Sequence, residues 1–555
     1  MNRTTRSIVL AITCANLLLN SQCQRLNHKF MRPKLAVVVV VDQMRADHLS
    51  RFAGVYKHGF GRILREGAIF TNAHHDHAYT VTGAGHATIA TGAYPSHNGI
   101  VGNNWFDRKE NKNVYCSEDT AAPLLGYPDS NLFNGRSPVR MLRTAIGDWL
   151  KEASPKSKVY GVGRKDRAAI LTAGMKADAA YWYHLGDGRM ITSEFYMKSY
   201  PQWVDDFNKS RMVDTFFEKG WQKFSHEETY FLAREDSFSA EYDGKHTAFP
   251  HAFTPASQKP DAHYYNALSV TPFSDKLILE FSKALVENEK LGEDDAPDIL
   301  FVGCSAADAV GHRFGPLSQE SLDHFLRLDS YLGDFFAFLD ERIGKENYLI
   351  ILSSDHGVMP MPEELIRRGF KAKRFSGLEL QTKIRKATID VSKELDISQR
   401  LIRGLSGFGL VVNYDSAKEA GVSRDELNSR LIDAYMRALP IEDIFNREDL
   451  ADGMRDARPY QQLYAHSFHP ERGGDLMLRM KEFYLTAGSH GTSHGSPYSY
   501  DTHVPIAFCG MGVRNGFFPG KVRTIDIAPT LADILGVAIP SDLDGQSLYE
   551  VILEE

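Results

Sequence analysis

The sequence predicts a doubly wound α/β fold, in which helices cover both faces of a mostly parallel central sheet. The first observation is a set of short apolar runs rich in β-branched residues, at 35–41, 159–162, 299–302, 348–352 and 504–508. Runs without polar alternation are typical of strands buried on both faces, as in a parallel sheet. The second observation is that helical patterns separate these runs. The third is that acidic side chains follow three of them.

Helices are expected between the apolar runs, at residues 139–151, 274–289 and 322–341. Ser274 is a suitable N-cap for the second helix. Two long stretches interrupt the alternation, at about 175–260 and about 362–488. Each is long enough to form a small lid or subdomain, and neither carries a recognisable motif. We therefore predict one large domain over residues 33–555 with two insertions.

The overall charge argues against one class of function. The 555 residues carry a formal net charge of −7. A dedicated nucleic-acid-binding protein would normally show a basic surplus, so we expect no nucleic acid partner. An acidic protein can still hold a small anion in a locally cationic pocket.

The first 23 residues have the pattern of a secretory signal peptide. Arg3 and Arg6 form a positive segment, and the apolar stretch 7–19 is too short to span a bilayer. We therefore expect a secreted protein, with a disordered N-terminus or a buried helix as the alternatives. Cys23 is a candidate for lipid anchoring, although Gln22 before it is a poor match to such signals. No other run approaches the ~20 apolar residues of a membrane helix, so no transmembrane segment is predicted.

Cysteine offers no metal site in this sequence. Cys14 lies inside the presumed signal peptide, and beyond Cys23 only Cys116, Cys304 and Cys509 remain, without a CxxC pair. Neither a thiolate zinc finger nor a thioredoxin motif is indicated. One disulfide is possible, and the sequence does not show which two cysteines would form it. Any metal ion must be held by histidine, carboxylate and hydroxyl groups.

A threonine in a glycine-rich turn is the first candidate for catalysis. Residues 79–88 read Tyr-Thr-Val-Thr-Gly-Ala-Gly-His-Ala-Thr, and two glycines closely follow Thr82. Glycines let the backbone turn sharply and approach a ligand closely. The Ala-rich stretch behind them predicts a helix that begins at Thr82, where the amides and the helix dipole favour an alkoxide and a nearby phosphate. Taken alone, Thr82 is more ordinarily interpreted as a helix cap.

Carboxylates and histidines follow the apolar runs. Asp42 directly follows the first run. Considered alone, an Asp in this position would ordinarily be a turn or cap residue. Asp308 and His312 are four residues apart after the third run, so they share one face of a turn. Asp355 and His356 follow the fourth run side by side. Because ligand sites of open α/β sheets form where the carboxyl ends of strands meet, the three acids together indicate a metal site.

A glycine-rich loop near the C-terminus adds a third histidine. His494 lies in this loop before the last apolar run, and His490 is the competing candidate. With Thr82, the set has three Asp, three His and one hydroxyl, which suits two zinc ions in catalytic sites with open positions. Two metal ions ~4 Å apart can activate a nucleophile and stabilise a leaving oxygen. Because Thr82 lacks the neighbours of a serine hydrolase triad, metal coordination is the way to activate it.

Asn103, Lys165 and Arg167 supply donors for an anion. Asn103 follows a glycine, and the Lys-Asp-Arg run follows the second apolar run. A phosphoryl group in transfer spreads charge over its nonbridging oxygens, which Lys and Arg hold well. A solvated loop is the ordinary interpretation of such a run, but its position after a core strand favours a binding role.

In this order, these residues resemble the alkaline phosphatase superfamily, most closely its bacterial zinc-dependent PafA-type alkaline phosphatases. The matching stretches are 40–45, 82–86, 102–105, 165–167, 308–312, 355–357, 494–498 and 526–531. The resemblance implies an alkaline phosphatase-like three-layer α/β/α sandwich with inserted cap segments. It also implies a periplasmic enzyme that acts on small phosphate monoesters, and we expect a monomer.

The resemblance assigns a role to each candidate residue. Four would surround the zinc ion that activates the nucleophile: Asp42, Thr82, Asp355 and His356. Three would hold the zinc ion that faces the leaving group: Asp308, His312 and His494. Thr82 would become a phosphothreonine that is later hydrolysed. Three residues would contact the phosphate oxygens: Asn103, Lys165 and Arg167.

Three alternatives share the fold. The phosphodiesterase and nucleotide pyrophosphatase branch resembles the chain in its metal ligands, but generally lacks the Lys-x-Arg pair. A sulfatase needs a Cys/Ser-x-Pro-x-Arg motif, which the turn at Thr82 lacks. A non-catalytic binding protein would have lost a ligand or the nucleophile, and every candidate is present. The sequence therefore predicts a two-zinc phosphomonoesterase, with the diesterase branch as the alternative.

Overall fold

The computed structural model describes residues 32–127, 135–217, 219–252, 259–407, 409–451 and 458–552. The chain divides into a unit Met1–Arg32 and a large unit Pro33–Glu555, and the fold is that of the large unit. The predicted signal peptide at residues 1–23 lies outside the described residues, as do Cys14 and Cys23. Within the described ranges, no helix combines the length and the apolar character that a bilayer crossing demands.

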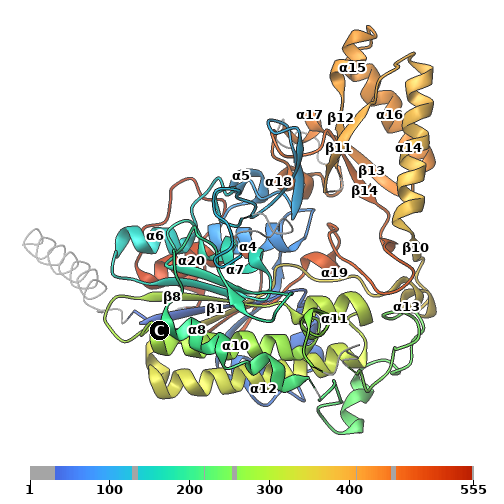
Figure 1. The fold of residues 1–555 in the computed structure, drawn as a ribbon. Helices are drawn as coiled ribbons and strands as arrows, with labels where there is room; N and C mark the ends of the chain where they lie inside the picture. The colour runs from blue at the N-terminus through green and yellow to red at the C-terminus, as the bar shows by residue number, and fades with distance from the viewer. Residues whose placement is uncertain are drawn as a thin grey trace, which may run out of the picture. The chain divides into compact units, whose positions relative to one another are not determined.

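A nine-stranded sheet forms the centre of the large unit (Figure 1). From one edge to the other its strands are β17 (Gly516–Arg523), β2 (Ala68–His74), β16 (Ile506–Gly510), β9 (Tyr348–Ser353), β1 (Leu35–Val41), β8 (Asp298–Cys304), β5 (Val159–Gly163), β6 (Ala179–Tyr183) and β7 (Met190–Ile191). The five strands from β9 to β6 run parallel. The last predicted run differs, because β16 pairs antiparallel with both β9 and β2.

Helices cover both faces of this sheet, which confirms the predicted α/β sandwich (Figure 1). The seven residues of β1 are all buried, because alternate side chains enter two different cores. One core contains side chains of α3 (Gly59–Glu66), α10 (Pro272–Asn288) and α12 (Gln319–Arg342). The other contains side chains of α4 (Thr82–Thr91), α6 (Ile146–Ala153) and α20 (Ile527–Leu535). A strand buried on both faces has no polar positions, which explains the continuous apolar run.

Two predicted helix starts are wrong. Helix α6 begins at Ile146 rather than at residue 139, because the Asp148 carboxylate accepts a hydrogen bond from the Ala145 amide at 2.8 Å and closes the first turn there. Helix α10 begins at Pro272 with Thr271 as its N-cap, so Ser274 is not the cap. Proline is favoured at the first helical position. The third predicted helix is present as α12.

Shorter helices connect the strands of the large unit. They are α2 (Ala46–Arg51), α5 (Pro95–Asn98), α7 (Asp166–Ala173), α8 (Gln202–Lys209), α9 (Ala262–Leu268), α11 (Ala306–Phe314), α13 (Pro362–Arg367), α19 (Ser499–Thr502) and α21 (Tyr549–Ile552). Two small two-stranded sheets join β3 (Asn104–Asp107) with β4 (Lys112–Tyr115), and β10 (Lys373–Phe375) with β15 (Tyr484–Thr486).

The two interrupting stretches contain different structures. The stretch from about residue 175 begins with β6 and β7, which extend the main sheet. The stretch 362–488 contains a second sheet, ordered β11 (Ile402–Ser406), β12 (Gly409–Val412), β14 (Leu476–Met480) and β13 (Ile441–Asn446). With this sheet come the helices α14 (Gly377–Glu394), α15 (Tyr414–Glu419), α16 (Arg424–Ala438), α17 (Arg447–Ala451) and α18 (Gln461–Ser467). This sheet packs with α14 and α16 around a hydrophobic core of its own.

The three described cysteines form no disulfide. Cys116, Cys304 and Cys509 are all buried and free. Burial raises the pKa of Cys116 to about 12, so its thiol is neutral near physiological pH. These cysteines therefore act as small apolar core residues.

Candidate metal and phosphate site

The central parallel strands bring the candidate residues to one edge of the sheet. Strands β9, β1 and β8 are neighbours in register, so their carboxyl ends lie together. Asp42 directly follows β1, Asp355 and His356 follow β9, and Asp308 lies in the first turn of the helix after β8. Strand β5 is the next parallel neighbour and leads to Lys165. Side chains that are far apart in the sequence therefore converge, as the strand ends predict.

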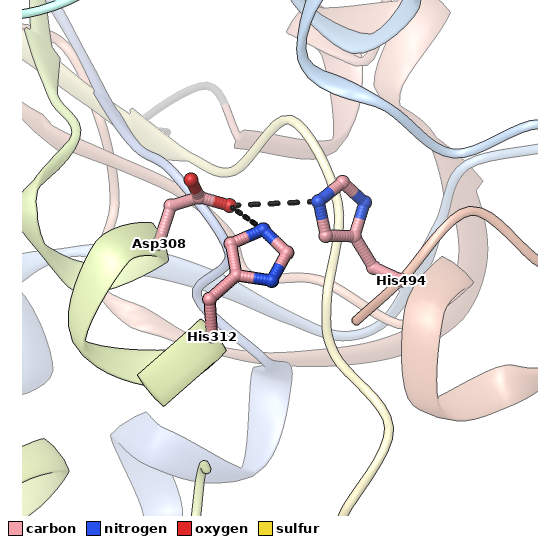
Figure 2. Close-up of side chains that lie close together, drawn as sticks. All are labelled: Asp308, His312 and His494. Carbon is pink, nitrogen blue, oxygen red and sulfur yellow. Dashed lines mark ion pairs between the residues drawn. The ribbon is translucent and has the colours of Figure 1, made fainter. Parts of the chain in front are cut away.

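One group of candidate ligands consists of Asp308, His312 and His494 (Figure 2). Oδ1 of Asp308 lies 3.3 Å from Nε2 of His312 and 3.5 Å from Nε2 of His494. Helix α11 holds the first two residues four positions apart, and His494 comes from the glycine-rich loop before α19. His490 hydrogen-bonds with Ser489 instead. The structure therefore brings His494, and not His490, to the carboxylate.

A second group lies around Asp42 and Asp355. Oδ2 of Asp355 is 3.2 Å from Nε2 of His356. His86 also reaches this group, with Nε2 at 3.5 Å from Oδ1 of Asp42 and Nδ1 at 3.5 Å from Oδ2 of Asp355. Sequence reasoning missed His86 as a site residue. The available signal was its position four residues after Thr82, which places both on one face of α4.

The donor atoms of these groups fit metal ions. Nδ1 of His312, His356 and His494 each lies 2.8 to 2.9 Å from a backbone carbonyl oxygen, so Nδ1–H donates and Nε2 is left as an acceptor. Within the described residues, Oδ1 of Asp42, Oδ2 of Asp355 and Nε2 of His356 are buried and have no hydrogen-bond partner, whereas Oδ2 of Asp42 pairs with Lys165. Buried polar atoms without partners are costly, and coordination of a cation would satisfy them.

The charges of these groups also favour a cation. Burial raises the pKa of Asp308, but Lys165 and His312 hold it well below its usual value. Burial lowers the pKa of His494 to about 3, so its ring is neutral near physiological pH. His356 is the exception, because Asp355 raises its pKa against the effect of burial. A bound cation would compete with the proton on that ring.

Gln43 fixes the carboxylates of Asp355 and Asp308 relative to each other. Its backbone amide donates to Oδ1 of Asp355 at 3.0 Å, and its Nε2 donates to Oδ1 of Asp308 at 2.9 Å. Its φ of 66° is in the left-handed region, which is uncommon for a residue other than glycine. Gly311 leaves room for the side chain, because a Cβ there would lie 1.8 Å from Oε1 of Gln43. Such local strain is typical of functional sites.

Thr82 is the first residue of α4 and is almost completely buried. Its Oγ1 accepts hydrogen bonds from Nζ of Lys165 at 3.2 Å and from Arg167 at 3.5 Å. Lys165 also lies 2.8 Å from a carboxylate oxygen of both Asp42 and Asp308. The predicted nucleophile, the two predicted cations and the candidate metal ligands therefore form one site.

The turn around Thr82 needs small residues for two close contacts. A Cβ at Gly85 would lie 2.1 Å from the backbone oxygen of Asp355, so only glycine allows α4 to approach the end of β9. The Gly83 amide donates to Oδ1 of Asn103 at 2.7 Å. Because its oxygen is engaged, the side-chain NH₂ of Asn103 is the part available to an anion.

A hydrogen-bonded network positions Arg167. Tyr115, from β4, accepts from Arg167 at 3.1 Å and donates to Asp166 at 2.7 Å. Asp166 in turn pairs with Arg136 at 2.6 Å. The Nε of Arg167 is buried and has no hydrogen-bond partner in the described part of the chain. The arginine fork is therefore held in place with a donor free for an oxyanion. Tyr115 and Arg136 carried no sequence signal, because they lie far from the motif.

Known proteins resemble the chain over the region that carries these residues. The sequence profile "Type I phosphodiesterase / nucleotide pyrophosphatase" matches residues 36–497. Alkaline phosphatase PhoV of Synechococcus elongatus is 34% identical over 528 residues, which cover 94% of this chain and 93% of that protein. Alkaline phosphatase PafA of Elizabethkingia meningoseptica is 33% identical over 533 residues, which cover 94% of this chain and 95% of that protein. A crystal structure of wild-type alkaline phosphatase PafA has a TM-score of 0.86 and 31% identity, and the match covers 94% of this chain and 99% of that one.

Proposed function

Because the chain belongs to the type I phosphodiesterase / nucleotide pyrophosphatase family of the alkaline phosphatase superfamily, we propose that it is an alkaline phosphatase. It is a metal-dependent hydrolase that converts phosphate monoesters to an alcohol and inorganic phosphate. One observation carries this proposal: the Thr82 hydroxyl lies beside two cationic side chains and two groups of metal-type ligands. The names of the relatives PhoV and PafA support it.

We propose two zinc ions as the cofactor. Nitrogen and oxygen donors without thiolates suit catalytic zinc. The first ion would be held by Asp42, Thr82, Asp355 and His356. The second would be held by Asp308, His312 and His494. When bound, the ions lower the pKa of the threonine hydroxyl and stabilise negative charge on the leaving oxygen.

The residues of the chain perform the other parts of the reaction. Thr82 Oγ1 attacks phosphorus, the P–O bond to the alcohol breaks, and the alcohol leaves with a proton. Water then attacks the phosphothreonine, which releases inorganic phosphate and restores the hydroxyl. Asn103, Lys165 and Arg167 hold the nonbridging oxygens while the charge on them is redistributed. The amides at the start of α4 favour the same anion.

The preference between esters tests this proposal directly. We expect the metal-loaded protein to hydrolyse phenyl phosphate with a kcat/KM at least about tenfold above that for methyl phenyl phosphate, because two cations favour a dianion over a monoanion. The measurement is initial rates on both esters, which share one leaving group. A faster rate on the diester would refute the monoesterase and favour a phosphodiesterase.

Removal of metal is expected to abolish turnover. Dialysis against a chelator should release two zinc ions per chain, measured by elemental analysis, and should lower the thermal unfolding midpoint because a ligand of the folded state is lost. Added zinc should restore both. The variant Asp308→Asn should bind one ion instead of two. Rescue by another divalent ion where zinc fails would overturn the zinc assignment, and full activity without metal would overturn the proposed mechanism.

The remaining proposals concern partners and location. We propose that the substrates are small phosphate monoesters, that nucleic acid is not a partner and that the chain acts as a monomer. The net charge of −7 supports the second of these. Secretion to a bacterial periplasm stays a prediction from residues 1–23, and lipid anchoring at Cys23 stays its alternative.

A further inference from the structure

A cavity of about 410 Å³ opens beside the proposed phosphate site. Its size is in the range of small-molecule sites. Its lining includes four apolar side chains, Leu124, Trp182, Leu185 and Ile191. Four cationic side chains also line it: Arg136, Arg164, Lys165 and Arg167. Asp308, a ligand of the proposed metal ion on the leaving-group side, also lines it.

Three of the four cations are engaged by other groups. Arg136 pairs with Asp166 at 2.6 Å, and its guanidinium lies over the ring of Tyr115, 5.0 Å from the centroid. Arg167 donates to the hydroxyl of Tyr115 at 3.1 Å. Lys165 bridges two carboxylates of the metal site at 2.8 Å each. These three side chains have structural partners or belong to the site already described.

Arg164 is different. Among the residues that the structure describes, it makes no hydrogen bond and no ion pair, and its Nε is buried without an acceptor. An arginine cannot shed its proton at physiological pH, so it keeps its charge. Burial lowers the pKa of Arg164, against the attraction of Asp308, Asp42 and Asp275. Metal ions on Asp308 and Asp42 would cancel the attraction of these two carboxylates and leave Asp275 as the acidic group near the guanidinium.

The position of Arg164 indicates which part of a substrate it would meet. It directly precedes Lys165 in the loop between β5 and α7, and it shares the cavity with Asp308. Lys165 and Arg167 point to Thr82, where the transferred phosphate would bind. The remaining space of the cavity therefore belongs to the alcohol part of the ester. Its apolar residues suit a carbon skeleton, and its cationic residues suit an anion.

We propose that Arg164 forms a second anion subsite, which recognises a negatively charged group on the alcohol of the substrate. This inference rests on the proposed phosphomonoesterase function. The substrate class is a phosphate monoester whose alcohol carries a second phosphate or a carboxylate. A carboxylate can present its two oxygens, and a phosphate two of its three terminal oxygens, to the arginine fork, which binds them with two parallel hydrogen bonds.

Three substrates with the same carbon skeleton test the subsite: glycerol 1-phosphate, 3-phosphoglycerate and glycerol 1,3-bisphosphate. The quantity measured is the kcat/KM for each doubly anionic ester divided by that for glycerol 1-phosphate. In Arg164→Gln we expect this ratio to fall at least about tenfold, because a charge-assisted pair is lost. A fall with 3-phosphoglycerate alone identifies a carboxylate subsite, and a fall with the bisphosphate alone identifies a phosphate subsite. A fall of the ratio for both esters shows that the subsite accepts either anion.

The matched control is Arg437→Gln. Arg437 is exposed on α16 and lines no part of this cavity, so the variant changes the net charge equally. An unchanged ratio in Arg164→Gln, or an equal loss on all three substrates, would overturn the subsite. If that variant does not fold, Arg164→Lys keeps the charge without the fork, and the ratio should fall at least about threefold because two parallel hydrogen bonds become one. An unchanged ratio would overturn the proposal. Failure of the proposed function is distinct, because the wild-type protein would then not hydrolyse glycerol 1-phosphate.

Discussion

Thr82→Ala is expected to lower kcat for phosphate monoesters by about 10³-fold or more, because removal of a nucleophile eliminates the covalent route. The protein should stay folded, since alanine has a high helix propensity and the lost hydroxyl accepts only two hydrogen bonds. Steady-state kinetics measure the loss. Acid-quenched intact-mass spectrometry should detect a phosphorylated species in the wild type and none in the variant.

Two variants separate loss of the nucleophile from general damage to α4. Thr82→Ser keeps a hydroxyl and should retain measurable turnover and a phosphorylated species. Thr88→Ala removes another buried hydroxyl of the same helix, one that makes no hydrogen bond to any residue the structure describes, and should retain most of the activity. Full turnover in Thr82→Ala would contradict the proposed mechanism and would point to direct attack by water.

The sequence was sufficient for the centre of the fold and for the edge where the site lies. Strand β1 occupies the predicted run, because an uninterrupted apolar stretch of seven residues fits burial in the cores on both faces of the sheet. The acids at the ends of β1 and β9 meet in space because these strands are parallel neighbours. Thr82 begins α4, as the glycine pattern predicts.

The features that the sequence did not predict depend on long-range contacts. The antiparallel direction of β16 follows from its pairing with both β9 and β2, and a strand's own residues do not encode that direction. Gln43 joins two carboxylates only because it adopts a left-handed φ after β1. Arg164 looks like any solvated cation in a loop. Its unpaired Nε becomes significant only when the cavity around it is known.

Simultaneous replacement of Lys165 and Arg167 by alanine is expected to lower kcat/KM for a monoester by roughly 10² to 10⁴-fold, because each charge-assisted contact contributes about 1.5–3 kcal/mol. The loss on a matched diester should be much smaller, since the diester has one negative charge fewer for the two cations to stabilise. The measurement is kcat/KM for phenyl phosphate and methyl phenyl phosphate in both proteins. The control is Lys209→Ala with Arg437→Ala, two exposed residues whose loss changes the net charge equally.

A second role for Lys165 makes this comparison decisive. Its ammonium lies 2.8 Å from oxygens of Asp42 and Asp308, so it contacts the proposed metal ligands as well as the nucleophile. If its main task were to organise those carboxylates, the double variant would lose zinc, and both esters would suffer equally. If the two cations hold the phosphate, zinc content should be preserved and the ratio of monoester to diester rates should collapse. Equal losses with normal zinc content would remove the physical basis for the monoester preference, because no other pair of described cations contacts Thr82.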